Sequence, residues 1–174
     1  RIPASLCGVV GFKPTFGRVS LRGVFPLSWN LDHAGPFAKS VRDIALMMQV
    51  MAVHDPLDPA SAKMLTGDYL GHLKDDVRAR KIALGVGDFI ETSDSEVLEA
   101  VREAANVFKS LGCKGEEVDV SWLQEAALAN KIMTQSDGAT DHRDRWKDHP
   151  EMFGDDIRRR LEDGTAHRAV KVLW

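Results

Sequence analysis

Residues 81–120, KIALGVGDFIETSDSEVLEAVREAANVFKSLGCKGEEVDV, combine two strand patterns with one helix pattern. Lys81 to Val86 is a short apolar run, and Glu116 to Val120 alternates acidic with apolar residues, as strands do. Between them, Ser93 to Glu96 forms a capping-box sequence, and Gly112 is a natural helix end. The order strand, helix, strand predicts a right-handed parallel βαβ unit at about 81–120 and an α/β fold class. The apolar stripe of the helix consists of Val97, Leu98, Val101, Ala104, Ala105, Phe108 and Leu111.

The first 36 residues are dense in glycine and proline, which favour tight turns between short strands. We predict a strand from Cys7 to Phe12, a second extended piece from Gly17 to Leu21, and an irregular loop from Arg22 to Pro36. A helix should begin at the capping-box sequence Ser40 to Asp43 and end at His54. Its apolar stripe consists of Val41, Ile44, Ala45, Met48, Met51 and Ala52.

The rest of the chain is more polar. Residues 58–80 are predicted to form a loop followed by turns or a weak, exposed helix. The segment from Ser121 to Trp174 is predicted to be rich in helix, and a second helix within it is expected from Asp155 to His167. The first helix of this segment is marked by Leu123, Ala127, Leu128 and Ile132.

Composition excludes several classes of protein. With 174 residues, 44% of them hydrophobic and 28% charged, the chain fits one soluble globular domain rather than a disordered or fibrous protein. No run approaches the roughly 20 apolar residues that span a bilayer. The net charge of −3 offers no basic face for phosphates, so neither a membrane nor a nucleic acid is an expected partner. The chain starts at Arg1 without an initiator methionine or a signal peptide, which indicates an excised piece of a longer, cytoplasmic protein.

The residue types that usually carry catalysis show no productive pattern. Cys7 and Cys113 lack the spacing of a zinc site, so we predict two buried, reduced thiols. The histidines never pair at the i, i+4 spacing of a helical metal site, so we predict solvated surface residues and no metal or cofactor. Asp141 to Asp144 is interpreted as a charged surface, because adjacent helical residues do not face each other. The six histidines are His33, His54, His72, His142, His149 and His167.

Two stretches nevertheless match a known pattern. Residues 1–20, RIPASLCGVVGFKPTFGRVS, closely resemble the segment that follows the nucleophile in the amidase-signature family. Residues 31–43, LDHAGPFAKSVRD, resemble the family motif built around Asp, two residues and Gly-Pro. From Lys81 to Val120 the similarity is one of pattern. The resemblance implies a mixed β-sheet flanked by helices, of which residues 1–174 form a partial domain, the central portion.

The same resemblance implies a chemistry for the parent protein. The family hydrolyses carboxylic amides, at C–N bonds other than peptide bonds, through a Ser, cis-Ser, Lys triad and an acyl-enzyme. Relatives keep the nucleophile in a Gly-Gly-Ser turn almost immediately before the residue equivalent to Arg1. No catalytic residue is assigned, because Ser5, Ser20, Ser28 and Ser40 match no triad position. Arg1 is the candidate substrate-binding residue, and support of the backbone is its alternative role.

We therefore predict that the parent protein acts on a small-molecule amide and that this chain alone is inactive. Two alternatives stay open: the A component of an aminoacyl-tRNA amidotransferase, and a non-catalytic binding or scaffold domain. Trp29 and His33 look more like the free-standing bacterial amidases. A partial sheet leaves unpaired edges and bare apolar helix faces. We expect a homo-oligomer, or association with the missing parts, to cover them.

Overall fold

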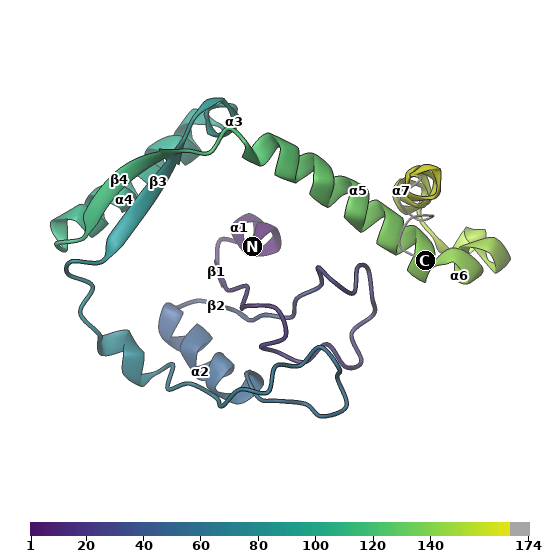
Figure 1. The fold of residues 1–174 in the computed structure, drawn as a ribbon, viewed down its shortest axis with the longest axis horizontal. Helices are drawn as coiled ribbons and strands as arrows, with labels where there is room; N and C mark the ends of the chain where they lie inside the picture. The colour runs from purple at the N-terminus through teal and green to yellow at the C-terminus, as the bar shows by residue number, and fades with distance from the viewer. Residues whose placement is uncertain (168–174) are drawn as a thin grey trace. The chain divides into compact units, whose positions relative to one another are not determined.

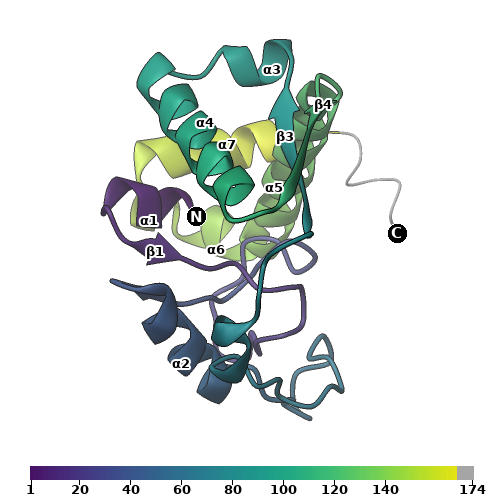
Figure 2. The same ribbon diagram turned by 90° about the vertical axis from the view of Figure 1, so that its left-hand side faces the viewer.

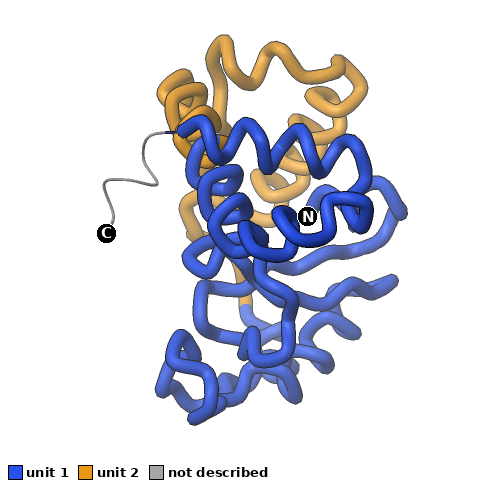
Figure 3. Tube along the Cα trace, turned by 90° about the vertical axis from the view of Figure 1, so that its right-hand side faces the viewer, with its two compact units in different colours: residues 1–75, 132–174 blue, residues 76–131 orange. Residues whose placement is uncertain are grey.

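The computed structural model describes residues 1–167 and divides into two compact units. Unit 1 comprises residues 1–75 and the chain from residue 132 onward, and unit 2 comprises residues 76–131 (Figure 3). Within the described residues there are two sheets of two strands each: β1 (Val10–Gly11) with β2 (Phe37–Ala38), and β3 (Lys81–Val86) with β4 (Lys114–Asp119). Helices accompany both sheets, so the predicted α/β class is confirmed.

Unit 2 contains the predicted strand, helix and strand. Strands β3 (Lys81–Val86) and β4 (Lys114–Asp119) pair in parallel, with Lys81 opposite Lys114 and Val86 opposite Asp119. After the single turn of α3 (Asp88–Glu91), helix α4 (Ser95–Ser110) connects the strands and lies along them (Figure 1). The parallel pairing is confirmed.

Local chemistry sets both ends of α4. Asp94, the second residue of the predicted capping box, is the N-cap, and its Oδ1 accepts a hydrogen bond from the Glu96 amide at 2.9 Å. Gly112 follows the helix with a φ of +88°, a conformation that glycine adopts without strain. Cys113 is buried, as predicted, and its Sγ donates to the Val77 carbonyl at 3.2 Å. No other residue of 76–131 is buried.

The start of unit 1 differs from the prediction. The strand expected from Cys7 to Phe12 is reduced to β1 (Val10–Gly11), because residues before it form helix α1 (Ile2–Leu6) and a turn. Pro3 lies in the first turn of α1, where its fixed φ and missing N–H are favourable. Gly8, with a φ of +62°, then allows the chain to turn. The extended piece predicted for residues 17–21 is also wrong, since a turn and bends occupy it.

Helix α2 (Val41–Met51) carries the hydrophobic core of unit 1. The predicted cap is confirmed: the Ser40 hydroxyl accepts from the Asp43 amide at 3.1 Å and donates to the Asp43 carboxylate at 2.7 Å. Val41, which the predicted stripe included, is 57% exposed. The buried core cluster consists of Val19, Ile44, Met48 and Ala52.

The later elements are helical, as predicted. The expected weak helix within residues 58–80 is a single 3-10 turn, η1 (Gly71–Lys74). Helix α7 (Asp155–Ala166) packs on α5 (Leu123–Asp141), because Gly164 lies against the Gln135 carbonyl, where a Cβ would come within 2.1 Å of the oxygen. Residues 168–174 of the predicted helical segment lie outside the described residues. The elements of this part are α5 (Leu123–Asp141), α6 (Arg143–Asp148), η2 (Pro150–Met152) and α7 (Asp155–Ala166) (Figure 2).

Several large apolar side chains of unit 1 face solvent. Ile2 is 78%, Leu6 84% and Leu65 94% exposed. A covering partner for such residues stays a prediction. Across residues 1–167, every helix is too short or too polar to span a membrane.

Candidate functional site

The two motif stretches meet at the antiparallel pair of β1 and β2 (Phe37–Ala38). Val10 lies opposite Ala38, and Gly11 lies opposite Phe37. Beyond the pair, the Phe12 amide donates to the Pro36 carbonyl at 3.1 Å. Residues 1–20 and 31–43 are therefore joined by backbone hydrogen bonds, although the chain between them is an irregular loop.

Glycines allow this joining at close range. A Cβ on Gly11 would lie 2.4 Å from the Ala4 Cβ, and Ala4 is 2% exposed. A Cβ on Gly35 would lie 2.1 Å from the Phe12 carbonyl oxygen. No side chain fits at such distances, because real Cβ atoms do not approach other heavy atoms this closely. Gly11 thus lets β1 approach the Ala4 side chain of α1, and Gly35 lets the second motif approach the backbone of Phe12.

Arg1 lies at the start of α1, the helix that packs against β1. It occupies the N-cap position of α1, its side chain is exposed, and its carbonyl accepts from the Ser5 amide at 3.0 Å. Within residues 1–167 its guanidinium has no hydrogen bond or ion pair, so it is free for a ligand or a further segment. Cys7, just beyond α1, is exposed, so the prediction of a buried thiol there is wrong. The helix and turn that replace the expected strand turn Cys7 toward solvent.

The segment after the first motif is held by Asp55. The Asp55 Oδ2 atom accepts from Arg22 Nε at 2.7 Å and from Ser20 Oγ at 2.9 Å, and its Oδ1 accepts from the Leu57 amide. These hydrogen bonds, above all that from Arg22, lower the pKa of Asp55 to about 2. The carboxylate therefore links residues 20–22 to the turn after α2 at any pH above the acid range.

The loop before the second motif is held by a buried serine. Ser28 is 1% exposed, and its Oγ donates to Asp137 Oδ2 of α5 at 2.5 Å. Asp32 closes the loop on itself, since its Oδ2 accepts from the Leu27 amide at 2.8 Å and from the Ser28 amide at 3.1 Å. At Gly138 a Cβ would lie 3.2 Å from Leu27 Cδ1, so α5 and the loop are in close contact.

His142 is buried next to this loop, contrary to the prediction of a solvated histidine. It is 7% exposed, its ring stacks on Phe25 with centroids 5.0 Å apart, and Phe153 meets it edge-on at 5.8 Å. The Arg145 guanidinium lies over the Phe25 ring at 4.7 Å. The charged surface predicted for Asp141 to Asp144 is therefore wrong at His142. The aromatic loop residue Phe25 covers it.

Asp141 is the member of this cluster with an unsatisfied buried oxygen. Its Oδ2 is buried and has no hydrogen-bond partner among the described residues. Burial raises the pKa of Asp141, the His142 and Arg145 charges oppose that shift, and the carboxylates of Asp137 and Asp32 add to it. The cluster therefore places three carboxylates near one another beneath the loop.

These residues do not form a catalytic triad. A serine nucleophile needs a base that takes its proton and a route for substrate. Ser28 donates to a carboxylate and not to His142, and at 1% exposure no substrate reaches its oxygen. Serine, aspartate and histidine act here as anchors. The sequence signal that could have located them is the run of small residues Ser136, Gly138 and Ala139 in α5, which indicates a close neighbour.

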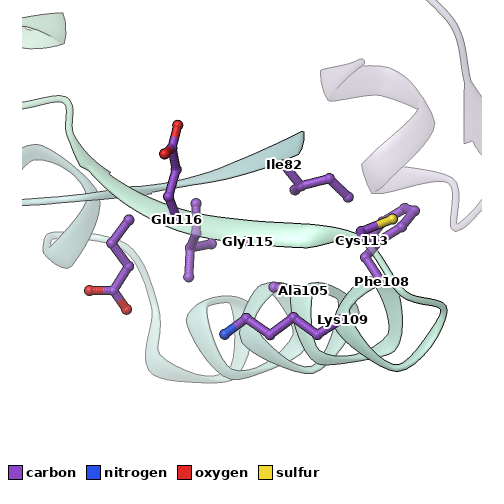
Figure 4. A pocket seen from close by; sticks show the side chains of 9 residues that line it. Ile82, Ala105, Phe108, Lys109, Cys113, Gly115 and Glu116 are labelled. Carbon is purple, nitrogen blue, oxygen red and sulfur yellow. The ribbon is translucent and has the colours of Figure 1, made fainter. Parts of the chain in front are cut away.

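Unit 2 has a separate cavity of about 370 Å³ between its sheet and α4. Figure 4 shows Ile82 of β3 facing Ala105 and Phe108 of α4, whereas Glu116 points to the opposite side of the sheet. The walls are mostly apolar, and the Cys113 thiol is already bonded to a carbonyl. No nucleophile and base converge there. Among residues 1–167 no group of three or more His, Cys, Asp or Glu is placed to hold a metal ion.

Comparison with known proteins shows the family to which these motif stretches belong. The Amidase family model matches residues 1–171. This chain belongs to the amidase family. An amidase of Pseudomonas putida is 38% identical over 99% of the chain. The A component of the glutamyl-tRNA(Gln) amidotransferase from Thermodesulfovibrio yellowstonii is 36% identical over 95% of it.

Solved structures of the family agree with this fold. The chain matches a protein of a vestigial complex described in connection with the origins of an s-triazine catabolic enzyme, with a TM-score of 0.86 and 33% identity over 95% of the chain and 35% of that protein. The crystal structure of the A component of the Thermotoga maritima glutamyl-tRNA(Gln) amidotransferase matches with a TM-score of 0.76 and 30% identity, over 95% of the chain and 35% of that protein. The chain spans 37% of the length of the P. putida amidase and 38% of the T. yellowstonii protein. It therefore corresponds to part of such proteins.

Proposed function

We propose that the protein containing this chain hydrolyses a small carboxylic amide through a serine acyl-enzyme, and that residues 1–174 are the part of its amidase-signature domain that follows the nucleophile. The triad of the family is Ser, cis-Ser and Lys, and none of its members is assigned to this chain. The chain by itself would then be inactive.

One observation carries this proposal. The two motif stretches, far apart in sequence, are joined through β1, β2 and the close contacts at Gly11 and Gly35. Such packing gives the start of α1 a fixed position, which a nucleophile turn directly before Arg1 would require. The similarity to amidases over nearly the whole chain supports the same interpretation.

The test is an assay of ammonia release from aliphatic and aryl amides. The longer protein should turn over at least one of them, and the 174-residue chain should give no rate above its buffer control. Turnover by the chain alone would show that a catalytic group lies within these residues. No turnover by the longer protein would favour a different role.

A second function is favoured by the amidotransferase relatives, which are about as similar as the amidase. In that case the protein would release ammonia from glutamine for a partner protein. The discriminating assay supplies glutamine together with misacylated tRNA and the partner proteins. Amide formation on tRNA would establish the amidotransferase role, and hydrolysis of simple amides without partners would establish the free-standing amidase.

For Arg1 we propose contact with the substrate or with the nucleophile turn. Its exposed guanidinium, without a partner among residues 1–167, supports this. In the longer protein, Arg1→Lys and Arg1→Ala should both lower kcat/KM for amide hydrolysis, Arg1→Ala more strongly, with the melting temperature unchanged. A lowered melting temperature with unchanged kinetics would assign Arg1 to backbone support instead.

A further inference from the structure

The hydrogen bond between Ser28 and Asp137 joins residues 109 positions apart within unit 1. Its acceptor is a carboxylate and Ser28 is almost fully buried, so water competes little for it. Breaking it leaves a polar group without a partner inside the protein, which is costly. This single contact therefore fixes one point of the loop firmly on α5.

Hydrogen bonds within the loop connect Ser28 to the residues that follow it. The Ser28 carbonyl accepts from the Leu31 amide at 2.9 Å and from the Asp32 amide at 2.8 Å. The Asp32 carboxylate in turn accepts the amides of Leu27 and Ser28. Residues 27–32 thus form one hydrogen-bonded turn.

From this turn the chain leads directly to the second motif. Gly35 lies against the Phe12 carbonyl, and the Pro36 carbonyl accepts the Phe12 amide. β2 then holds β1, and Gly11 of β1 lies against Ala4 of α1. Residues 33 and 34 connect the turn to Gly35 along the backbone, and each later step from Gly35 to α1 is a contact at van der Waals or hydrogen-bond distance.

We infer that Asp137 is a positioning residue, which acts through Ser28 to fix the loop of residues 27–32 and thereby β1 and the start of α1. The inference rests on the proposed function for its catalytic consequence. Its structural part, that Asp137 sets the order of β1 and β2, stands on the contacts alone. Asp137 touches no reacting atom in this arrangement.

The test uses the full-length protein that contains this chain, with the variants Asp137→Asn, Ser28→Ala and the double variant. Asp144→Asn is the matched control, because Asp144 is exposed and pairs only weakly with Arg143, at 3.5 Å. Hydrogen exchange is measured by mass spectrometry on peptides covering residues 8–13 and 35–39. Amide hydrolysis is measured well below each melting temperature.

Each single variant should speed exchange in both peptides by about tenfold, as loss of one charged hydrogen bond allows. The double variant should add little, because both changes remove the same bond. In the same variants kcat should fall by about tenfold while KM changes less, and Asp144→Asn should match the wild type.

Unchanged exchange in the two peptides would overturn the inference. So would a lowered melting temperature with unchanged kcat in an active enzyme, because that describes a purely structural bond. If the wild type hydrolyses no amide, the proposed function is wrong, and exchange alone then decides whether Asp137 orders β1. Should Asp137→Asn fail to fold, Ser28→Ala carries both measurements.

Discussion

Units 1 and 2 differ in how regular secondary structure relates to the burial of side chains. Unit 2 is regular, with paired strands and a capped helix, yet Cys113 is its one buried residue among 76–131. Unit 1 has two-residue strands and long irregular segments, yet it contains the hydrophobic core and the buried polar anchors. Regular secondary structure and burial are therefore separate properties here. The irregular unit 1 is the one in which buried contacts hold the side chains in place.

The largest expected difference concerns the hydrophobic core. Met48 of α2 is 1% exposed, whereas Leu98 of α4 is only half-buried. Met48→Ala should lower the free energy of unfolding by about 2 to 5 kcal/mol, because it leaves a cavity, and Leu98→Ala by about 1 kcal/mol. Urea denaturation of both variants measures the difference. An equal loss of unfolding free energy in both variants would contradict the proposed difference in burial between the units.

A smaller effect is expected for glycines. An added Cβ at Gly35 meets the Phe12 carbonyl, which is backbone, whereas at Gly115 it meets Lys109 Cε at 3.0 Å, the end of a flexible side chain. Gly35→Ala should cost about 1 to 3 kcal/mol of stability, and Gly115→Ala less than about 0.5 kcal/mol. Thermal melting of the two variants tests this. A harmless Gly35→Ala would show that the two motif stretches can separate without cost.

The smallest effect is a pH dependence. The pKa of Asp55 is about 2 in the folded chain against an ordinary 3.8, so its stabilising effect is complete above pH 3.8 and is lost as the pH falls from there toward 2. In unit 2 the pKa of Asp119 is also lowered, by hydrogen bonds from Ser121 two residues away. Protonation of Asp55 should release residues 20–22, and protonation of Asp119 should have only a local effect.

An NMR titration from about pH 6 to about pH 2 checks this expectation. Amide signals of residues 20–22 should shift with the Asp55 carboxyl signal, and Asp55→Asn should abolish that coupling while leaving the Asp119 titration in place. Coupled shifts throughout unit 2 on protonation of Asp119 would contradict the distinction.

The sequence alone predicts the two units to very different extents. Periodicity located β3, α4 and α2 closely, because amphipathic stripes and caps such as Ser40 are local signals. It failed at Cys7, where Pro3 starts a helix that the apolar run concealed. It could not find the bond between Ser28 and Asp137, because nothing local links residues 109 apart.

The same limit applies to the candidate site. The motif resemblance indicates the family and draws attention to Arg1. It does not give the physical reason for the motif glycines, which the contact between Phe12 and Gly35 shows. For His142, the lack of a histidine partner at the i, i+4 spacing predicts a solvated surface residue. A ring from a distant loop, Phe25, covers it instead.

The discontinuity of unit 1 has a consequence for synthesis on the ribosome. Residues 1–75 are made first, but their partner segment emerges only after all of unit 2 has been translated. At roughly 5 to 20 residues per second, the 109 residues that follow Ser28 up to Asp137 take about 5 to 20 s to synthesise. Unit 2 consists of sequence-local pairings, which form early and shorten the chain that must close. Until residues 132–145 are synthesised, Phe25 and Ser28 therefore lack the contacts that cover them in the folded chain.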